Sequence, residues 1–385
     1  MFQEKYRKEN LIIVLFILIV IISQGIRGYL NSLIGSSIFN YHVIPISLIT
    51  LMVLIKTNRF SKSNFIVFLS ISGLIIMGFL LNRYSFSDFI RTVVGFILPL
   101  LILLIDHRDM DIKYVFTKIV KYFNVYIYIT FIIQLVISIR VGRTGGIVGH
   151  PLTSGWYYAI FISFNIIYYK FFRTKSDLLI IIDSGIALVG TVLASGRISM
   201  FTVIILSIIY SFCCCKRRSI TYLILPVFII VFLSTPVVDE YIWSKFRDTA
   251  SWGDISNGRL LGIREMMFFS KYPNFFIGRG IGYSNYVSQY VFGVVNFENP
   301  ILMFSYDYGI IGTLLLITLI LINPIFRFIN KKNYLLTAIY SCVLIIPFTY
   351  NGLAETVGIF IVLIFIIYIF SCLDYYIMRI KSYRV

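Results

Sequence analysis

Histidine, cysteine and charged residues are scarce in this sequence. It contains three His and five Cys among 385 residues, and Asp, Glu, Lys and Arg together make up 13%. The His residues are scattered, and the Cys residues fall at one expected helix end or inside apolar runs, so neither has the spacing of a metal site. The sequence also lacks a Walker-type phosphate loop and internal repeats. We therefore expect a protein that uses no metal and no cofactor.

Long apolar runs make up most of the chain. Hydrophobic residues account for 59% of it and the mean hydropathy is +0.89, values typical of membrane proteins. The runs lack the alternation of barrel strands, and many approach the roughly 20 residues that a transmembrane helix needs. They predict an all-α, polytopic integral membrane protein with about twelve transmembrane helices and a single transmembrane domain over 1–385.

The predicted spans are Leu11–Ile26, Ile38–Ile55, Phe65–Leu81, Phe89–Ile105, Tyr114–Ile139, Trp156–Phe172, Leu178–Ala194, Met200–Cys215, Ile220–Thr235, Ile301–Phe326, Tyr334–Tyr350 and Thr356–Ile377.

The net charge of +17 follows the predicted spans and gives no reason to expect a nucleic-acid partner. Of the 34 Lys and Arg residues, 22 fall at the termini or in every second loop, as the positive-inside rule requires. This asymmetry predicts that both termini are cytoplasmic. It also predicts that the large loop at 236–300, between the ninth and tenth spans, is extracytoplasmic.

The 12 basic residues on the predicted outer side are mostly arginine. Two are Lys (Lys245 and Lys271), whereas the inner side has nine Arg and 13 Lys. The other ten are Arg27, Arg83, Arg91, Arg140, Arg143, Arg197, Arg247, Arg259, Arg264 and Arg279. Topology needs only positive charge, but a planar guanidinium binds phosphate or carboxylate at two points. We therefore expect several outer Arg to form one anion site. The alternative is that they pair with Asp88, Asp239, Asp248 or lipid headgroups.

The large loop contains two expected helices and a glycine run. Pro236–Trp252 has apolar residues at helical spacing, typical of an interfacial helix. Asn257 resembles an N-cap for a helix that ends before Pro273. The glycines that follow, Gly278, Gly280 and Gly282, either form a tight loop or allow the backbone to approach a ligand or a neighbouring helix.

The loop ends at a helix start with an acidic residue beside it. Asn299 is the expected N-cap and Pro300 the first helical residue of the tenth span. Glu298 then lies at the outer boundary, either as a general base or as a charge that complements the helix dipole. Asp307, inside the span, is expensive to hold in lipid and is expected to face protein or a cavity.

Four short motifs occur in a defined order on the predicted outer side. They are Gly149-His150-Pro151, Ser195-Gly196-Arg197, the segment from Ser256 to Gly282 with Asn257-Gly258-Arg259 and Gly278-Arg279-Gly280, and Asp307-Tyr308-Gly309 with Gly312. Together they resemble bacterial O-antigen ligases and O-antigen or capsular polysaccharide polymerases. The ligase branch has His directly before the Asn of its last motif, where this chain has Glu298, so the polymerase branch is favoured.

This resemblance implies a metal-independent glycosyltransferase of GT-C-like architecture in the bacterial cytoplasmic membrane. It implies transfer of a polyprenyl-pyrophosphate-linked glycan onto a sugar hydroxyl of a lipid-linked repeat unit, with membrane lipid and other polysaccharide-assembly proteins as partners. The residues implied to bind pyrophosphate are Arg197, Arg259, Arg264 and Arg279. Glu298 is the candidate base and His150 the second choice. Trp252, Tyr283, Tyr286 and Tyr290 are candidates for stacking on sugar rings.

Two alternatives stay open. One is transfer to another acceptor, as in O-antigen ligases. The other is a lipid-linked oligosaccharide flippase or transporter, since twelve spans with both ends inside is also a transporter plan. Transporters of this plan usually have repeated halves and a site near the bilayer midplane. This sequence instead concentrates its polar residues in one outer loop.

Overall fold

The computed structural model consists almost entirely of helices, with no strand in the part of the chain that it describes. That part comprises residues 2–21, 26–35, 41–57, 60–82, 85–172, 177–214, 233–251, 263–265, 267–268, 272–280, 282–284, 286–287, 299–349, 352–355 and 357–382. The prediction of an all-α fold is therefore confirmed.

The first half of the chain forms helices that overlap the predicted spans, except α2 and η5, which lie between spans. They are α1 (Phe2–Val20), α2 (Arg27–Ile34), α3 (Val43–Thr57), α4 (Lys62–Asn82), the run α5–η3–α6–η4 (Phe86–Thr92, Val93–Ile97, Leu98–Leu100, Leu101–Leu104), α7 (Ile112–Val141), η5 (Gly146–Val148), α8 (Pro151–Phe171), α9 (Asp177–Leu193) and α10 (Arg197–Cys214). The ninth predicted span, Ile220–Thr235, lies outside the described residues except at its end.

The second half begins with the run α12–η6–α13 (Pro236–Val238, Asp239–Trp243, Ser244–Ser251). Its remaining helices are α16 (Pro300–Ile317), η7 (Thr318–Ile322), α17 (Asn323–Asn330), α18 (Tyr334–Ile345), η8 (Ile346–Thr349), α19 (Gly352–Glu355) and α20 (Val357–Ser382).

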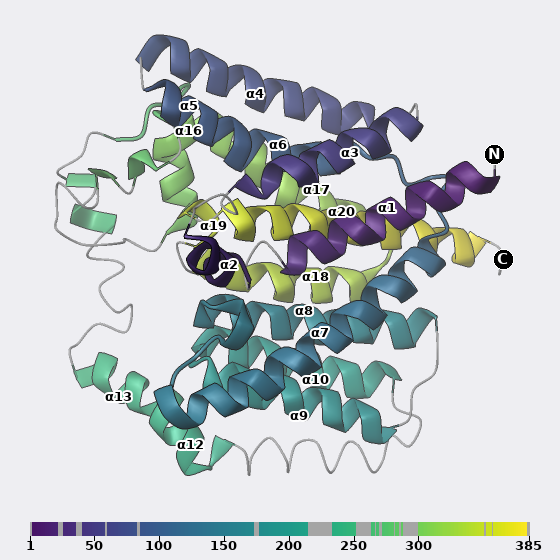
Figure 1. The fold of residues 1–385 in the computed structure, drawn as a ribbon, viewed down its shortest axis with the longest axis vertical. Helices are drawn as coiled ribbons and strands as arrows, with labels where there is room; N and C mark the ends of the chain where they lie inside the picture. The colour runs from purple at the N-terminus through teal and green to yellow at the C-terminus, as the bar shows by residue number, and fades with distance from the viewer. Residues whose placement is uncertain are drawn as a thin grey trace.

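Two helices form the centre of the bundle. In α8 every residue from 153 to 167 is buried, and 89% of the apolar stretch of α20 is buried. α8 packs against α7, α9, α10 and α18, while α20 packs against α1, α3 and the run α6–η4. Figure 1 shows both chain termini at one end of the bundle, and α12 and α13 at the opposite end. We call this opposite end the loop end.

Small residues let the helices around α8 approach closely. A Cβ placed on Gly155 of α8 would lie 2.5 Å from Ser199 Oγ of α10, and one on Gly190 of α9 would lie 2.2 Å from the Tyr158 ring. Helix packing in lipid depends on such close contacts, because lipid tails give helices no hydrophobic reason to associate. The Trp156 indole N–H donates to the Val343 carbonyl of α18 at 2.9 Å and so joins α8 to the second half.

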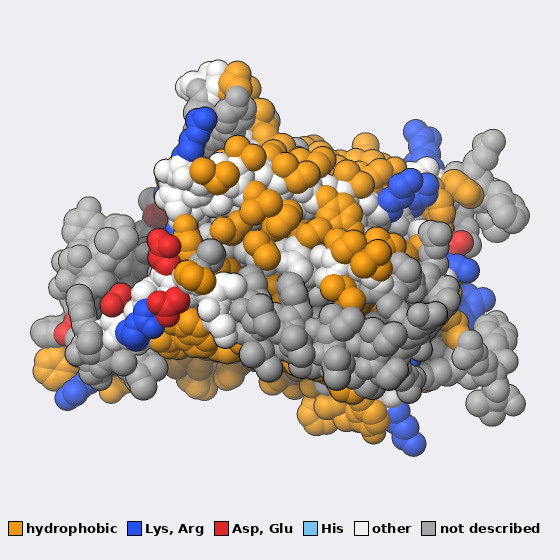
Figure 2. Space-filling view, turned by 90° about the horizontal axis from the view of Figure 1, so that it is seen from below, with side chains coloured by type: hydrophobic (Ala, Val, Ile, Leu, Met, Phe, Trp, Pro, Cys, Tyr) orange, Lys and Arg blue, Asp and Glu red, His pale blue; other side chains and the backbone are white. Residues whose placement is uncertain are grey.

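The surface of the bundle suits a membrane. Charged side chains gather toward the two ends, with hydrophobic side chains between them (Figure 2). Within the described part, six helices are long and apolar enough to span a bilayer: Asn64–Leu81, Phe86–Leu104, Ile112–Val141, Arg197–Cys214, Pro300–Asn330 and Gly358–Ile380. A membrane protein is therefore supported, while the number of twelve spans stays a prediction.

The expected amphipathic helix at Pro236–Trp252 is present as the run α12–η6–α13. Val238 and Ile242 are fully buried and pack with Val192 of α9 and Met200 of α10. The apolar side of this run therefore covers the loop-end tips of α9 and α10.

Candidate functional site

Two helices begin side by side at the loop end. α8 and α10 pack directly against each other and run parallel, with α9 between them in the sequence. Their N-terminal ends touch where Ser199 packs against Gly155. Neither helix has an acidic residue in its first turn. The free N–H groups and the dipoles of both helices therefore favour an anion at the same place.

The turn between α9 and α10 determines where the second of these helices starts. Ala194 N–H donates to the Gly190 carbonyl at 3.1 Å, and Gly196 N–H donates to the Thr191 carbonyl at 3.2 Å, which closes the end of α9. Ser195 adopts the left-handed conformation with φ 51°. This conformation costs a residue other than glycine about 1–2 kcal/mol, and it reverses the chain so that α10 begins at Arg197.

Two buried hydroxyls lie in these helix-start segments. Ser154, in the first turn of α8, is 1% exposed, and Ser195 is 5% exposed. Neither Oγ atom has a hydrogen-bond partner among the described residues. Burying a hydroxyl without a partner costs about 1–3 kcal/mol, so both groups are donors suited to a bound anion.

A polar lock holds the loop between α7 and α8 against α9. Gln134 is fully buried in α7, and its Nε2 donates to the carbonyls of Thr144 at 2.8 Å and Gly190 at 3.1 Å. Its Oε1 accepts from the Tyr158 hydroxyl at 2.7 Å. The Thr144 N–H also donates to the Leu193 carbonyl at 3.2 Å. These bonds bring the α7–α8 loop next to the start of α10.

The lock places two arginines and a histidine around the paired helix starts. Arg197 is half-buried, and its guanidinium carbon lies 4.8 Å from the centre of the Phe246 ring of α13. The Arg143 Nε donates to the Ala194 carbonyl at 3.3 Å. His150 is exposed at the N-cap of α8 and makes no side-chain capping bond. We call this arrangement of Arg143, His150, Ser154, Ser195 and Arg197 the arginine cluster.

A second arrangement lies where the large loop meets α16. Arg279 is exposed, its Nη1 donates to the Tyr283 hydroxyl at 2.7 Å, and its guanidinium carbon lies 4.9 Å from the ring centre. In the described part of the chain, no carboxylate forms an ion pair with Arg279. The arginine cluster contacts α13, and the Arg279–Tyr283 pair contacts α16. Both helices reach the loop end (Figure 1).

The glycine run packs on α16. The Gly280 N–H donates to the main-chain carbonyl of Asp307 at 2.8 Å, and the Gly282 N–H donates to the Asp307 carboxylate at 3.2 Å. A Cβ on Gly278 would lie 2.0 Å from the Asp307 carbonyl oxygen. Of the uses expected for these glycines, the structure shows close approach to a neighbouring helix. Asp307 is 2% exposed, so the expectation that it faces protein is confirmed.

The remaining predicted residues have varied environments. Arg247 forms a two-point ion pair with Asp239, both bonds 2.8 Å, and Arg91 lies 3.8 Å from Asp88, as the alternative interpretation of the outer arginines expected. Arg264 is exposed. Asn299 Oδ1 accepts from Leu302 N–H at 3.0 Å and Pro300 is the first helical residue, so this helix start is confirmed. Trp252, Asn257, Arg259, Tyr290 and Glu298 lie outside the described residues.

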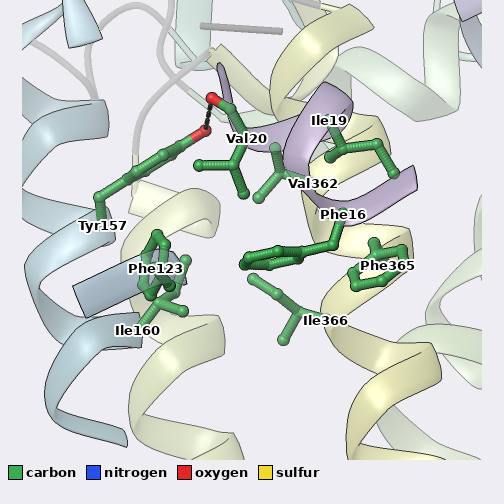
Figure 3. A pocket seen from close by; sticks show the side chains of 9 residues that line it. All are labelled: Phe16, Ile19, Val20, Phe123, Tyr157, Ile160, Val362, Phe365 and Ile366. Carbon is green, nitrogen blue, oxygen red and sulfur yellow. Dashed lines mark hydrogen bonds between the residues drawn. The ribbon is translucent and has the colours of Figure 1, made fainter. Parts of the chain in front are cut away.

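A cavity inside the bundle is too small to hold a substrate. It lies between α1, α7, α8 and α20, has a volume of about 10 Å³ and is lined by apolar side chains and Tyr157, whose hydroxyl donates to the Val20 carbonyl (Figure 3). Such a volume holds one water at most. His, Cys, Asp and Glu also form no metal-binding group in the described ranges.

The side chains that assemble the arginine cluster could not be assigned from the sequence. Gln134 is an amide inside an apolar span, and its partners Tyr158 and Gly190 come from helices far along the chain. The charge pattern predicts that Arg143 lies on the outer side, but it assigns Arg143 no role in a site. The one available signal was the run Gly142-Arg143-Thr144-Gly145-Gly146, whose glycines permit the turn that the loop makes.

Comparison of the sequence with protein-family models and with curated proteins gives no match.

Proposed function

We propose that this protein is a membrane glycosyltransferase of the polysaccharide-polymerase type. It transfers a polyprenyl-pyrophosphate-linked glycan onto a sugar hydroxyl of a second lipid-linked repeat unit. The reaction takes place at the outer face of the bacterial cytoplasmic membrane, with both chain termini in the cytoplasm. The motifs that resemble O-antigen ligases and polymerases suggest the reaction, and the arginine cluster is the structural observation that carries it.

The chemistry of the arginine cluster fits a pyrophosphate leaving group. Polyprenyl pyrophosphate already carries the activation energy of the transfer, so the enzyme has to bind it and stabilise its growing negative charge. Arg197 can bind two phosphate oxygens at once. The starts of α8 and α10 supply free N–H groups, and Ser154 and Ser195 supply hydroxyl donors.

The depth of the cluster along the bundle also supports this assignment. From Pro151 to Lys170, α8 rises about 28 Å at 1.5 Å per residue. Lys170 belongs to the basic residues of the opposite, inner side. The hydrocarbon core of a bilayer is roughly 30 Å thick, so a cluster at Pro151 matches the level of lipid headgroups. The pyrophosphate of a membrane-embedded polyprenol lies at this level.

The other predicted residues take roles around the bound pyrophosphate. Arg259, Arg264 and Arg279 add positive charge from the large loop. Glu298 accepts the proton of the attacking hydroxyl, with His150 as the second candidate. Tyr283 and Tyr286, whose rings are stacked with centres 6.5 Å apart, present aromatic faces for sugar rings at the loop end.

Deletion of the gene tests the proposal in the organism that carries it. We expect single repeat units on polyprenyl pyrophosphate to accumulate at the outer face of the membrane, with loss of the long polymer. A ligase-like enzyme would instead leave long lipid-linked chains that are not transferred to their acceptor. Repeat units retained on the cytoplasmic face would contradict the proposal and favour a flippase.

A further inference from the structure

We infer that Asp307 is a positioning residue that fixes the Arg279–Tyr283 pair at the loop end. Its buried carboxylate holds the turn that carries this pair. The role in positioning rests on the proposed function, because it assumes that Arg279 meets the substrate. The anchoring of the turn by Asp307 stands on the structure alone.

The carboxylate of Asp307 is bonded to the backbone of the turn on both oxygens. Oδ1 accepts from the Ser284 N–H at 2.8 Å, and Oδ2 accepts from the Gly282 N–H at 3.2 Å. Ser284 is fully buried, and Asp307 is 2% exposed. Hydrogen bonds from N–H groups to a charged acceptor are stronger than those between neutral groups. Tyr283 lies between the two donors, so its position follows from the anchor.

The main chain of α16 opens beside Asp307 and binds the same loop. Gly309 leaves the helical conformation at φ 81° and ψ 162°. The N–H groups of Ile310 and Ile311 then donate to the carbonyls of Asn274 and Phe275, each at 3.0 Å. The loop backbone therefore replaces the missing turn of α16, which leaves fewer polar groups unsatisfied in a membrane-spanning segment.

Bonds and close contacts also hold the main chain on both sides of Arg279. Gly278 packs so closely on Asp307 that it has no room for a side chain, and the Gly280 N–H donates to the Asp307 carbonyl. The Arg279 N–H donates to the Tyr306 carbonyl at 3.2 Å. The main chain of Arg279 is thus fixed, and its exposed guanidinium is directed by the Tyr283 hydroxyl.

This geometry makes Asp307 unsuitable as a general base. A base has to reach the proton that it takes, within about 3 Å. The Asp307 oxygens are buried and occupied by main-chain N–H groups. Its effect on a reaction at the loop end passes through the turn.

The test replaces Asp307 by Asn in the full-length protein in lipid nanodiscs and follows hydrogen exchange of the amides. An Asn side chain has only one acceptor oxygen. One of the two main-chain N–H donors would therefore face the Asn NH₂ group and lose its hydrogen bond. We expect exchange at Gly282 and Ser284 to become about tenfold faster, the equivalent of one lost hydrogen bond. Asp183→Asn is the matched control, because Asp183 is a buried carboxylate that accepts from Tyr128 at a distant place. Unchanged exchange in Asp307→Asn overturns the anchor.

A second variant serves if Asp307→Asn does not fold. Gly282 has φ 84°, and a Cβ there would meet nothing within 4 Å, so Gly282→Ala strains the turn without a clash. We expect the same faster exchange at Ser284. Exchange at Ser284 as slow as in the wild-type protein would overturn the anchor.

The positioning role is tested by kinetics with a lipid-linked donor. We expect Asp307→Asn to raise KM for the donor about tenfold while kcat changes less, because the displaced Arg279 loses contact with the bound pyrophosphate. Faster exchange with an unchanged KM would overturn the positioning role. If the wild-type protein makes no polymer, the proposed function fails, and inorganic pyrophosphate becomes the probe. Inorganic pyrophosphate should then slow amide exchange at Gly282 and Ser284 in the wild-type protein but not in Asp307→Asn. Equal effects on both proteins would overturn the positioning role.

Discussion

Arginines at the loop end differ in their surroundings, and we expect this difference to distinguish binding residues from structural ones. Arg247 is held at two points by Asp239, and this hydrogen-bonded pairing lowers the pKa of the Asp239 carboxyl. Arg197 lies instead beside two helix starts with no acidic residue in their first turns. The two side chains share one end of the molecule, so they form a matched pair for substitution.

We predict that Arg197→Lys loses at least about tenfold in polymer synthesis, since lysine keeps the charge but loses the two-point geometry, and hydrogen bonds to charged groups contribute about 1.5–3 kcal/mol. Arg247→Lys should retain near-normal synthesis at the same protein level. The measurement is polymer formed per amount of protein in isolated membranes. Equal activity of both variants would reduce Arg197 to a charge that sets topology.

Ser195 allows a test that separates stability from binding. Its left-handed conformation costs about 1–2 kcal/mol, and glycine adopts this conformation without strain. We therefore predict that Ser195→Gly keeps or raises Tm but raises KM for the lipid-linked donor, because the site loses a hydroxyl that has no partner among the described residues. Thermal unfolding and initial rates are measured on the same preparation. A normal KM would remove Ser195 from the site.

Glu298 is the residue predicted to act on the acceptor hydroxyl. Glu298→Gln keeps the size of the side chain but removes the charge that accepts a proton. We predict that this variant accumulates single repeat units while the donor still binds. Glu240→Gln is the control, since Glu240 is an exposed acid of η6 at the same end. Polymerisation at the normal rate would leave Glu298 as a charge that complements the start of α16.

At the scale of elements, we expect the segment from Asn274 to Gly280 to lie at the outer edge of the membrane. A Cβ on Gly78 of α4 would lie 3.0 Å from the Gly278 carbonyl oxygen, so the two chains touch there. From Lys62 to Gly78, α4 rises about 24 Å at 1.5 Å per residue. In a hydrocarbon core of roughly 30 Å, we therefore expect this segment at the level of the outer headgroups and upper acyl chains.

Phe275 and Phe276 are 54% and 58% exposed in this loop. We predict that these rings insert into the outer leaflet, because exposed phenylalanines at this depth are more stable in lipid than in water. A nitroxide attached at position 276 should be accessible to oxygen and protected from a water-soluble nickel complex. A nitroxide at position 240 is the control and should show the reverse. Access of the nickel complex to both sites would contradict this placement.

Elements with local signals were predicted from sequence, and elements that depend on distant partners were not. The Asn299-Pro300 helix start and the amphipathic run at Pro236–Trp252 were predicted because capping and helical spacing depend only on residues that are close in the sequence. The break of α16 at Gly309 was missed, because its N–H groups are satisfied by Asn274 and Phe275, which lie in another segment. The same reason hid the use of Asp307 as an anchor.

At the scale of the whole molecule, the arginine cluster is a consequence of how three helices follow one another. α8 runs away from the loop end, α9 returns to it and α10 runs away again, so the starts of α8 and α10 are neighbours. Sidedness of the charges predicted that Arg143 and Arg197 share one side of the membrane. Their common site could not be predicted, because Gln134, Tyr158 and Gly190 join it across three helices.

We propose that the chain alone joins lipid-linked repeat units at the outer face of the membrane. The most direct measurement places the purified protein in vesicles with polyprenyl-pyrophosphate-linked repeat units supplied to the outer leaflet. We predict chains of increasing length on polyprenyl pyrophosphate in wild-type vesicles, and single units only in vesicles that contain Arg197→Lys. Movement of intact repeat units across the bilayer with no new glycosidic bond would contradict the account and identify a transporter.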